Sequence, residues 1–528
     1  MRSWQRLATA IAAVTVIGFG MPAAAQKSGG ILKMYDPDSP PTMSILEEAT
    51  IGSQAPMMGV FNNLVLFDQH APQNRLDTIQ PDLATGFSWN EDGTALTLPL
   101  RQGVKWHDGK PFTAADVKCT WDLLMETGSD KLRFNPRKSF YKNVDRITTN
   151  GDHEVTFHLK RPQPAFPMLL ATGFSAIYPC HVPAAQMRQH PIGTGPFKFV
   201  EFKQNESIKV TKNPDYWKPG FPYLDGIEYT IIKDPSTALL AFLAGNFDMT
   251  FPYTLRIPQL KDVQSQSPQA HCEVTPAGGV NSHVLVNRDT PPFNNLDVRK
   301  AMSLALDRKA FIDILQEGQG DIGGVLQPPP GGQWGMSPEM VKQLPGYGLD
   351  IEKNRAEARQ IMQKLGYGPG NPLKLKVSTR DFTIYRDPAV ILIDQLKQVY
   401  FDGELELIDT SRYFPKIMRK EFTVALNLQT SGPEALELFY ACGASLNWDG
   451  YCNKDVDDLL QKQSEEANED RRKQILWQIE HKLAEDFARP IISYGRIATC
   501  WQPYVKNITL STNSVFSANR REDTWLDK

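Results

Sequence analysis

The chain has 528 residues, enough for several domains and for large buried cores that need no metal ion or disulfide to be stable. Its 57 Lys and Arg against 60 Asp and Glu give a formal net charge of −3. This balance argues against a nucleic-acid-binding protein, which needs a basic face for the phosphates. Hydrophobic residues make up 41% and charged residues 22%, which is typical of a globular protein and excludes a disordered chain.

Residues 1–25 have the pattern of a cleaved export signal. Arg2 and Arg6 precede an apolar stretch at 7–19, and an A-x-A pattern ends directly before Gln26. The apolar stretch is shorter than the ~20 residues that span a bilayer, so it favours a cleaved signal over a membrane anchor. Because the segment has no twin-arginine pair and no cysteine at the cleavage site, we expect Sec export without a lipid anchor.

The N-terminal half of the mature chain is predicted to be rich in short strands. Residues 58–69 have the pattern of a helix that leads into a strand, and Thr113 is suited to cap a helix that begins at Ala114. Alternation of apolar and polar residues predicts strands over 96–101, 154–160, 197–212 and 226–232.

The C-terminal half alternates helices with strands. Apolar residues at helical spacing predict one helix over 297–316 and another, near the end of the chain, from Glu469 to Phe487. Between them the pattern predicts a helix over 353–367, a strand over 373–379, a helix over 389–400 and a strand over 404–409. This βαβ-like alternation is typical of a doubly wound α/β lobe.

All six cysteines follow the predicted signal, so export carries them into an oxidising compartment. Cys442 and Cys452 bracket a turn-rich segment, which makes a disulfide that closes this loop plausible. Cys119 lies on the apolar face of a predicted helix and is expected to be a buried free thiol. The sequence does not settle the pairing of Cys119, Cys180, Cys272 and Cys500.

The common catalytic motifs are absent from the sequence, which has no G-x-S-x-G, H-E-x-x-H or Walker A pattern. A G-x-G-x-x-G match at 318–323 follows a predicted helix and not a strand, so it does not indicate a dinucleotide site. The nine His residues show no metal-ligand spacing, and we predict neither a metal site nor a cofactor. A dispersed catalytic pair would escape this search, so a secreted hydrolase stays an alternative.

Six long segments resemble family 5 of the solute-binding proteins of ABC importers, the peptide/nickel type. They are RQGVKWHDGKPFTAADV (101–117), GTGPFKFVEF (193–202), NPDYWKPGFPYLDGIEY (213–229), FNNLDVRKAMSLALDRKAFI (293–312), KNRAEARQIMQKLGY (353–367) and the long C-terminal segment 451–491. They follow the order of the family and cover nearly all of the mature chain. Several long motifs in order are far more specific than one short motif.

The resemblance implies the α/β fold of a type II periplasmic binding protein, with two lobes, a two-strand hinge and an extra subdomain in the first lobe. We expect the subdomain at 69–190 and the second lobe at 286–501, with hinge crossings near 283–287 and 496–501. The first lobe would be discontinuous and take the remaining segments: 26–68, 191–285 and 502–528. In dipeptide-binding members, a disulfide closes the loop that matches Cys442 to Cys452.

The resemblance also suggests where the ligand binds. In dipeptide-binding members, an aspartate after the core strand of the second lobe holds the α-amino group of the peptide. Gln429 stands nearest to that position here, and its neutral amide offers an ammonium no charge partner. Arg380 matches the carboxylate-binding arginine of the family, although a salt bridge to Asp381 or Asp387 is the alternative. Four further residues are candidates for the cleft: Ser431, Trp448, Tyr253 and His283.

The resemblance therefore implies a monomeric periplasmic receptor, which captures a small solute between its lobes and delivers it to an inner-membrane ABC permease. An acidic, sugar-like or opine-like solute is favoured over a plain dipeptide, and nucleic acid is not expected as a partner. A peptide, a metal chelate or haem is the alternative ligand. A secreted hydrolase and a periplasmic chaperone or sensor are the alternative functions.

Overall fold

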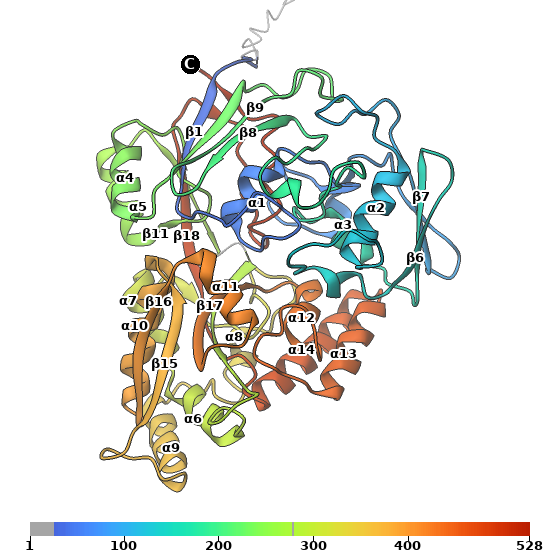
Figure 1. Ribbon diagram of the computed structural model, residues 1–528. Helices are drawn as coiled ribbons and strands as arrows, with labels where there is room; N and C mark the ends of the chain where they lie inside the picture. Colours follow the sequence, from blue (N-terminus) through green and yellow to red (C-terminus); the bar gives the residue numbers. More distant parts are fainter. Residues whose placement is uncertain (1–25, 277–278) are drawn as a thin grey trace, which may run out of the picture.

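The computed structural model describes residues 26–276 and 279–528, so the predicted signal peptide at 1–25 lies outside the described residues. The chain folds into two α/β lobes, which lie one above the other in Figure 1. Both ends of the described chain belong to the upper lobe, where the Lys27 ammonium lies 2.8 Å from the Asp527 carboxylate. No helix of the described residues is long and apolar enough to cross a membrane.

The upper lobe contains a four-stranded sheet that joins distant parts of the chain. Its first strand runs parallel to its neighbour, and the other two strands continue the sheet antiparallel. In sheet order the strands are β1 (Ile31–Asp36), β10 (Gly226–Ile231), β9 (Ser207–Lys212) and β8 (Phe197–Lys203). The helices beside it are α1 (Ile51–Met58), α4 (Pro235–Leu243) and α5 (Ile257–Gln266).

The predicted helix at the start of 58–69 is wrong, because α1 ends where that helix was expected to begin. The carbonyls of Gly59 and Val60 accept hydrogen bonds from the backbone N–H groups of Phe197 and Gly195, at 3.0 Å each. These carbonyls are therefore engaged by the chain at the start of β8, and the segment continues as a loop. The predicted strand in this segment is present as β2 (Val65–Phe67).

The helix predicted to begin after Thr113 packs against a second sheet of the upper lobe. Helix α2 spans Ala114–Leu124, and the carboxylate of Asp116 accepts the backbone N–H of Thr113 at 2.9 Å, so the predicted start is correct. Trp121 of α2 packs edge-on against Phe157, with ring centroids 4.8 Å apart. The strands of this sheet are β4 (Ser88–Trp89), β5 (Ala95–Pro99), β7 (Glu154–Leu159) and β6 (Val144–Thr149).

The cysteines form three disulfides, and the predicted free thiol of Cys119 is wrong. Cys119 pairs with Cys180, because the segment before Cys180 docks on α2. There the backbone N–H of Cys180 donates to the Asp116 carboxylate at 2.9 Å, and the backbone N–H of Tyr178 donates to the hydroxyl of Thr120 at 3.0 Å. The other disulfides are Cys442–Cys452, as the resemblance implied, and Cys272–Cys500.

The lower lobe is built on a mixed sheet. Its parallel part contains β16 (Phe401–Ile408), β15 (Leu373–Arg380) and β17 (Val424–Thr430), and β13 (Val280–Val286) pairs antiparallel with β17. Helix α10 (Thr383–Lys397) connects β15 to β16, as the βαβ pattern predicted. Other helices of this lobe are α9 (Ile351–Lys364), α11 (Thr410–Met418), α12 (Pro433–Tyr440), α13 (Lys454–Glu465) and α14 (Glu469–Glu485).

One long strand, β18 (Ile491–Trp501), runs through both lobes. Its first residues pair with β13, whereas residues 496–501 pair with β12 (His271–Pro276) of the upper lobe. The Cys272–Cys500 disulfide joins two register partners of β12 and β18. The residue limits of the lobes and the hinge positions given above stay predictions.

The predicted single helix over 297–316 is wrong, because the segment forms two helices. Helix α6 spans Leu296–Ala305 and α7 spans Arg308–Gln316. Asp307 lies between them, and its carboxylate accepts the backbone N–H of Ala310 at 3.0 Å, which caps the second helix. A capping aspartate within an apolar helical pattern thus starts a new helix.

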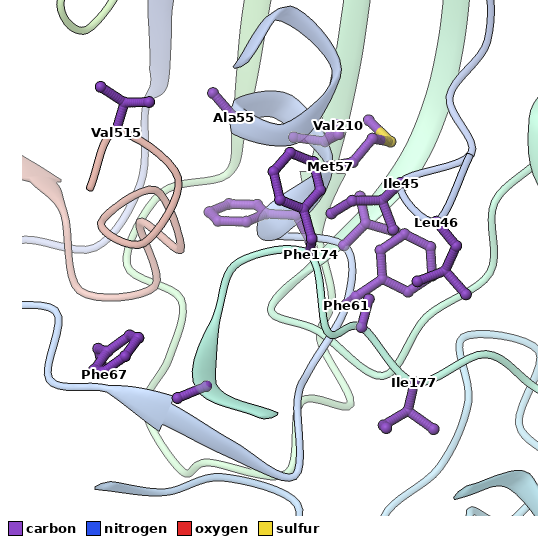
Figure 2. Close-up of a cluster of buried hydrophobic side chains, with 14 of the residues drawn as sticks. Ile45, Leu46, Ala55, Met57, Phe61, Phe67, Phe174, Ile177, Val210 and Val515 are labelled. Carbon is purple, nitrogen blue, oxygen red and sulfur yellow. The ribbon is translucent and has the colours of Figure 1, made fainter. Parts of the chain in front are cut away.

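The core of the upper lobe gathers side chains from segments far apart in the sequence, as Figure 2 shows. Phe61 stacks on Tyr178 with ring centroids 5.3 Å apart, and Phe174 meets Phe516 at 4.8 Å. Phe174 and Phe516 also line the cavity described below, together with Phe67. The wall of the cavity on this side is therefore continuous with the packed core.

Candidate ligand-binding site

A cavity of about 330 Å³ lies between the two lobes. Ligand pockets in proteins typically measure about 300–1,000 Å³, so this cavity suits a small solute. The upper lobe contributes the stretch 49–52 and the C-terminal stretch 513–517, and the lower lobe contributes 427–435. Aromatic side chains form much of the wall: Phe67, Phe140, Phe174, Trp334, Phe382, Tyr385, Phe414 and Phe516.

All six candidate residues from the sequence line this cavity, although they come from distant elements. Tyr253 belongs to the upper lobe, and Trp448 lies in the loop closed by the Cys442–Cys452 disulfide. The other four come from the sheet of the lower lobe or directly follow its strands: His283, Arg380, Gln429 and Ser431. The structure brings these residues together, and their contact with a ligand stays a prediction.

Arg380 ends strand β15 and is 4% exposed. Its Nη2 donates to the hydroxyl of Tyr385 at 2.7 Å, and its guanidinium lies 4.8 Å from the ring centroid of Phe382. Among the described residues, its Nε has no hydrogen-bond partner. The alternative partner Asp387 instead binds Arg256 at 2.9 Å. Arg380 lines the cavity and therefore keeps unused hydrogen-bonding capacity close to it.

The acid that lies across from Arg380 is Asp38 of the upper lobe, with 3.8 Å between Nη2 and Oδ2. Asp38 Oδ1 accepts the backbone N–H of Ser39, and within the described part of the chain Oδ2 has no hydrogen-bond partner. Burial, with a smaller contribution from the Asp38 charge, raises the pKa of the neighbouring Asp36 well above its usual range. Arg380 thus faces one loosely placed carboxylate.

Gln429 is held on both sides by the protein. Its Oε1 accepts from Arg489 Nη1 at 2.9 Å, and its Nε2 donates to the hydroxyl of Tyr440 at 2.9 Å. Arg489 is itself buried and binds Asp449 at 2.8 Å. The amide therefore stands beside a guanidinium, in surroundings that oppose a ligand ammonium at this position.

The remaining four candidates differ in what their polar atoms do. The hydroxyl of Ser431 donates to the carbonyl of Gly279 at 2.9 Å, and that of Tyr253 donates to the carbonyl of Ser511 at 3.0 Å. No partner among residues 26–276 and 279–528 satisfies either ring nitrogen of His283 or Nε1 of Trp448. Burial, followed by the charge of Arg489, holds the pKa of His283 well below its usual range, so its imidazole is neutral.

Among the cavity residues that were missed in the sequence are two buried arginines, Arg489 and Arg137. Arg137 is buried, and its guanidinium lies 3.7 Å from the ring centroid of Phe174. Burial lowers the pKa of Arg137 to about 9. Arg489 stands in an apolar stretch that leads into a buried strand. An arginine in such a setting needs a hydrogen-bonding partner. This sequence signal could have identified Arg489.

The described residues contain no group of three or more His, Cys, Asp or Glu side chains that could hold a metal ion. What the cavity offers instead is buried arginines, among them Arg380 with its unpartnered Nε, a loosely placed carboxylate, neutral polar atoms and aromatic walls. Such a set binds and orients a small polar molecule.

Comparison with known proteins gives matches over most of the chain. The family model of bacterial extracellular solute-binding proteins, family 5 middle, matches residues 78–449. Di/tripeptide-binding protein 1 of Pseudomonas aeruginosa (strain UCBPP-PA14) is 25% identical over 493 residues, which cover 87% of each chain.

Solved structures show the same fold. Haemophilus influenzae OppA, in complex with the peptide RPPGFSPFR, has a TM-score of 0.82 at 19% identity and covers 95% of this chain and 99% of its own. The periplasmic binding protein AgaA from A. tumefaciens R10, in complex with agropinic acid, has a TM-score of 0.81 at 21% identity. The match covers 94% of this chain and 99% of the AgaA chain.

Proposed function

The chain belongs to family 5 of the bacterial extracellular solute-binding proteins, and we propose that it is a periplasmic receptor that delivers a small solute to an inner-membrane ABC permease. A ligand that touches both lobes binds the closed form better and shifts the population toward it. A shift from 1:99 to 99:1 needs about 5.5 kcal/mol of differential affinity. The closed form is the one that the permease would recognise.

The proposed ligand is a small acidic solute of sugar-like or opine-like character. The observation that carries this proposal is Arg380, which is buried, lines the cavity and has an unpartnered Nε within the described residues. A ligand carboxylate there would gain a charge-assisted hydrogen bond and stacking surface from the surrounding rings. The agropinic acid complex of AgaA supports this ligand class.

A plain peptide is the second candidate, and Asp38 is the observation that favours it. Its free carboxylate oxygen could accept the α-ammonium of a peptide, which Gln429 does not. The names of curated relatives, such as the di/tripeptide-binding protein of P. aeruginosa, point in the same direction. The position of Arg489 beside Gln429 argues against an ammonium bound as in dipeptide-binding members.

A thermal-shift screen over peptides, sugars, sugar acids, opines and metal chelates tests the proposal. A ligand at about 100 times its dissociation constant adds ~2.7 kcal/mol of stability, which raises the melting temperature by a few degrees. We expect the largest shift from an acid. A dipeptide that gives the largest shift would overturn the proposed ligand class while leaving the receptor role in place.

Arg380→Ala tests the proposed carboxylate contact. We expect the affinity for the best acid to fall roughly 10- to 100-fold, because a charged hydrogen bond contributes ~1.5–3 kcal/mol. Arg386→Ala is the matched control, since this arginine on α10 is exposed and does not line the cavity. Equal affinities of the Arg380→Ala variant and the unmodified protein would contradict the contact.

A further inference from the structure

The sheet of the lower lobe presents a patch of polar side chains to the cavity. His283 of β13 lies directly opposite Asn427 of β17, and Asn281 lies opposite Gln429. Residues directly opposite in an antiparallel pair point to the same face, and so do residues two apart in a strand. All four therefore share one face, and three of them line the cavity. The exception is Asn281.

Buried polar atoms in such a patch destabilise the fold unless they are hydrogen-bonded. Gln429 is held by Arg489 and Tyr440, and Asn281 donates to the hydroxyl of Tyr494 at 3.2 Å, although its Oδ1 has no partner among the described residues. His283 is different. It is 1% exposed, and neither of its ring nitrogens has a partner among the described residues.

Trp448 adds a further unpartnered polar atom to the same cavity. It is 7% exposed, and its Nε1 has no acceptor within the part of the chain that the structure describes. The centroid of its ring lies 5.8 Å from that of Phe414, so flat apolar surface lies beside the indole ring. Two separate elements, strand β13 and the disulfide-closed loop, thus place residues with unpartnered polar atoms in the lining of the cavity.

We infer that His283 and Trp448 form a neutral subsite that binds hydroxyl groups of the ligand by hydrogen bonds. This inference rests on the proposed function and implies that the ligand is a hydroxylated carboxylic acid. The neutral imidazole of His283 offers one donor and one acceptor, and the indole of Trp448 offers one donor. A hydroxyl group is both donor and acceptor, and therefore matches either side chain. The positive charge of Arg489 acts on His283 and opposes a ligand ammonium at this position.

The aromatic surroundings favour a compact hydroxylated ligand over an extended peptide. Such a ligand has a polar edge for the imidazole and indole and C–H groups for the flanking rings of Trp448 and Phe414. Arg380 holds the carboxylate, and the neutral subsite selects among acids. The subsite thereby separates hydroxylated acids from simple fatty or dicarboxylic acids, which Arg380 alone would not distinguish.

Isothermal titration of the mature protein with matched acids tests this assignment. The hydroxylated probes are D-gluconate, D-glucarate and D-galacturonate, and the probes without hydroxyl groups are hexanoate and adipate. We expect at least one hydroxylated acid to bind at least tenfold more tightly than both plain acids. Equal binding of both classes, or no binding of any hydroxylated acid, overturns the inference.

His283→Phe removes both ring nitrogens and keeps a planar ring. We expect it to weaken the best hydroxylated acid about tenfold and to leave hexanoate binding unchanged, with His283→Gln recovering part of the loss. His153→Phe, at an exposed position, is the control. Equal weakening of both acids by His283→Phe overturns the inference, and if that variant does not fold, the same criterion applies to His283→Gln and to Trp448→Phe.

The Arg380→Ala variant separates this inference from the proposed function. If Arg380→Ala weakens every acid but hydroxylated and plain acids bind alike, the proposed function stands and the hydroxyl-binding subsite fails. If a dipeptide binds best and Arg380→Ala has no effect, the proposed ligand class itself fails.

Discussion

At the scale of single residues, the contact between Arg380 and Asp38 decides which charge the cavity favours. The two groups belong to different lobes and lie 3.8 Å apart, a loose ion pair with free atoms on both partners. A ligand carboxylate competes with Asp38 for Arg380, whereas a ligand ammonium competes with Arg380 for Asp38. The charge of the ligand therefore determines whether a substitution of Asp38 raises or lowers the affinity for that ligand.

Asp38→Asn is expected to raise the affinity for the best acidic ligand roughly fivefold, because removing a competing carboxylate is worth ~1 kcal/mol. Asp36→Asn serves as the control, since Asp36 is a neighbouring buried acid that does not line the cavity. Isothermal titration of both variants measures the effect. A loss of affinity in Asp38→Asn alone would indicate that the ligand carries an ammonium.

His107 gives a pH dependence of stability that does not involve the ligand. Its Nε2–H donates to the carbonyl of Gly195 at 3.0 Å and its Nδ1 accepts the backbone N–H of Gly193 at 3.2 Å, so the buried ring is bound in its neutral form. Burial lowers the pKa of His107 from 6.5 to about 4. The unfolded chain binds the proton first, so this contribution is complete above pH 6.5 and is lost as the pH falls toward 4.

Urea unfolding at several pH values between 7.5 and 4 measures this contribution of His107 to the free energy of unfolding. The unmodified protein should lose roughly 3 kcal/mol of unfolding free energy over this range through His107, and His107→Gln should lack that part of the slope. Parallel pH profiles of the two proteins would contradict the assignment.

At the scale of elements, the loop closed by Cys442 and Cys452 links stability to ligand binding, because it carries Trp448. Replacing both cysteines by serine should lower the unfolding free energy by ~2–3 kcal/mol and weaken ligand binding, since the loop then holds the indole less firmly. Removing Cys119 and Cys180 together should cost stability without loss of affinity, because neither lines the cavity. Denaturant unfolding and titration of both double variants make the comparison.

Local sequence patterns predicted elements well where the decisive residues are neighbours. The start of α2 follows from Thr113 and Asp116, three residues apart. The break between α6 and α7 depends on Asp307, a local signal that an unbroken apolar pattern concealed. The loop after α1 depends on hydrogen bonds to residues at the start of β8, which no local pattern contains.

The contacts that the sequence did not predict in and around the site join residues far apart in the chain. The six cavity residues were found through the resemblance to a family and not through spacing. The pairs Cys119–Cys180, Arg489–Asp449 and Arg380–Asp38 join residues that only the folded chain brings together.

At the scale of the whole molecule, ion pairs join the lobes around the cavity. Arg161 lies 2.7 Å from Glu465, Lys233 lies 3.0 Å from Asp409, and Arg256 binds Asp387. All are partly exposed, so each contributes only ~0.2–1 kcal/mol and is screened by salt. Because each pair joins residues of the two lobes, we expect these pairs to form when the lobes approach and to favour the closed arrangement.

The double variant Glu465→Gln and Asp409→Asn should therefore weaken ligand binding roughly two- to tenfold and reduce the dependence of affinity on salt. Glu421→Gln, which breaks a pair with Arg419 inside the lower lobe, is the control. Titration at low and high NaCl concentration, with small-angle scattering to follow closure, measures the effect. An unchanged salt dependence in the double variant would show that these pairs do not contribute to closure.

The most direct test of the account is native mass spectrometry of the receptor purified from the periplasm, followed by denaturation and identification of the released molecule. The account predicts one small hydroxylated carboxylic acid per protein chain, recovered chemically unchanged. A released dipeptide, or a molecule cleaved by the protein during incubation, would contradict it.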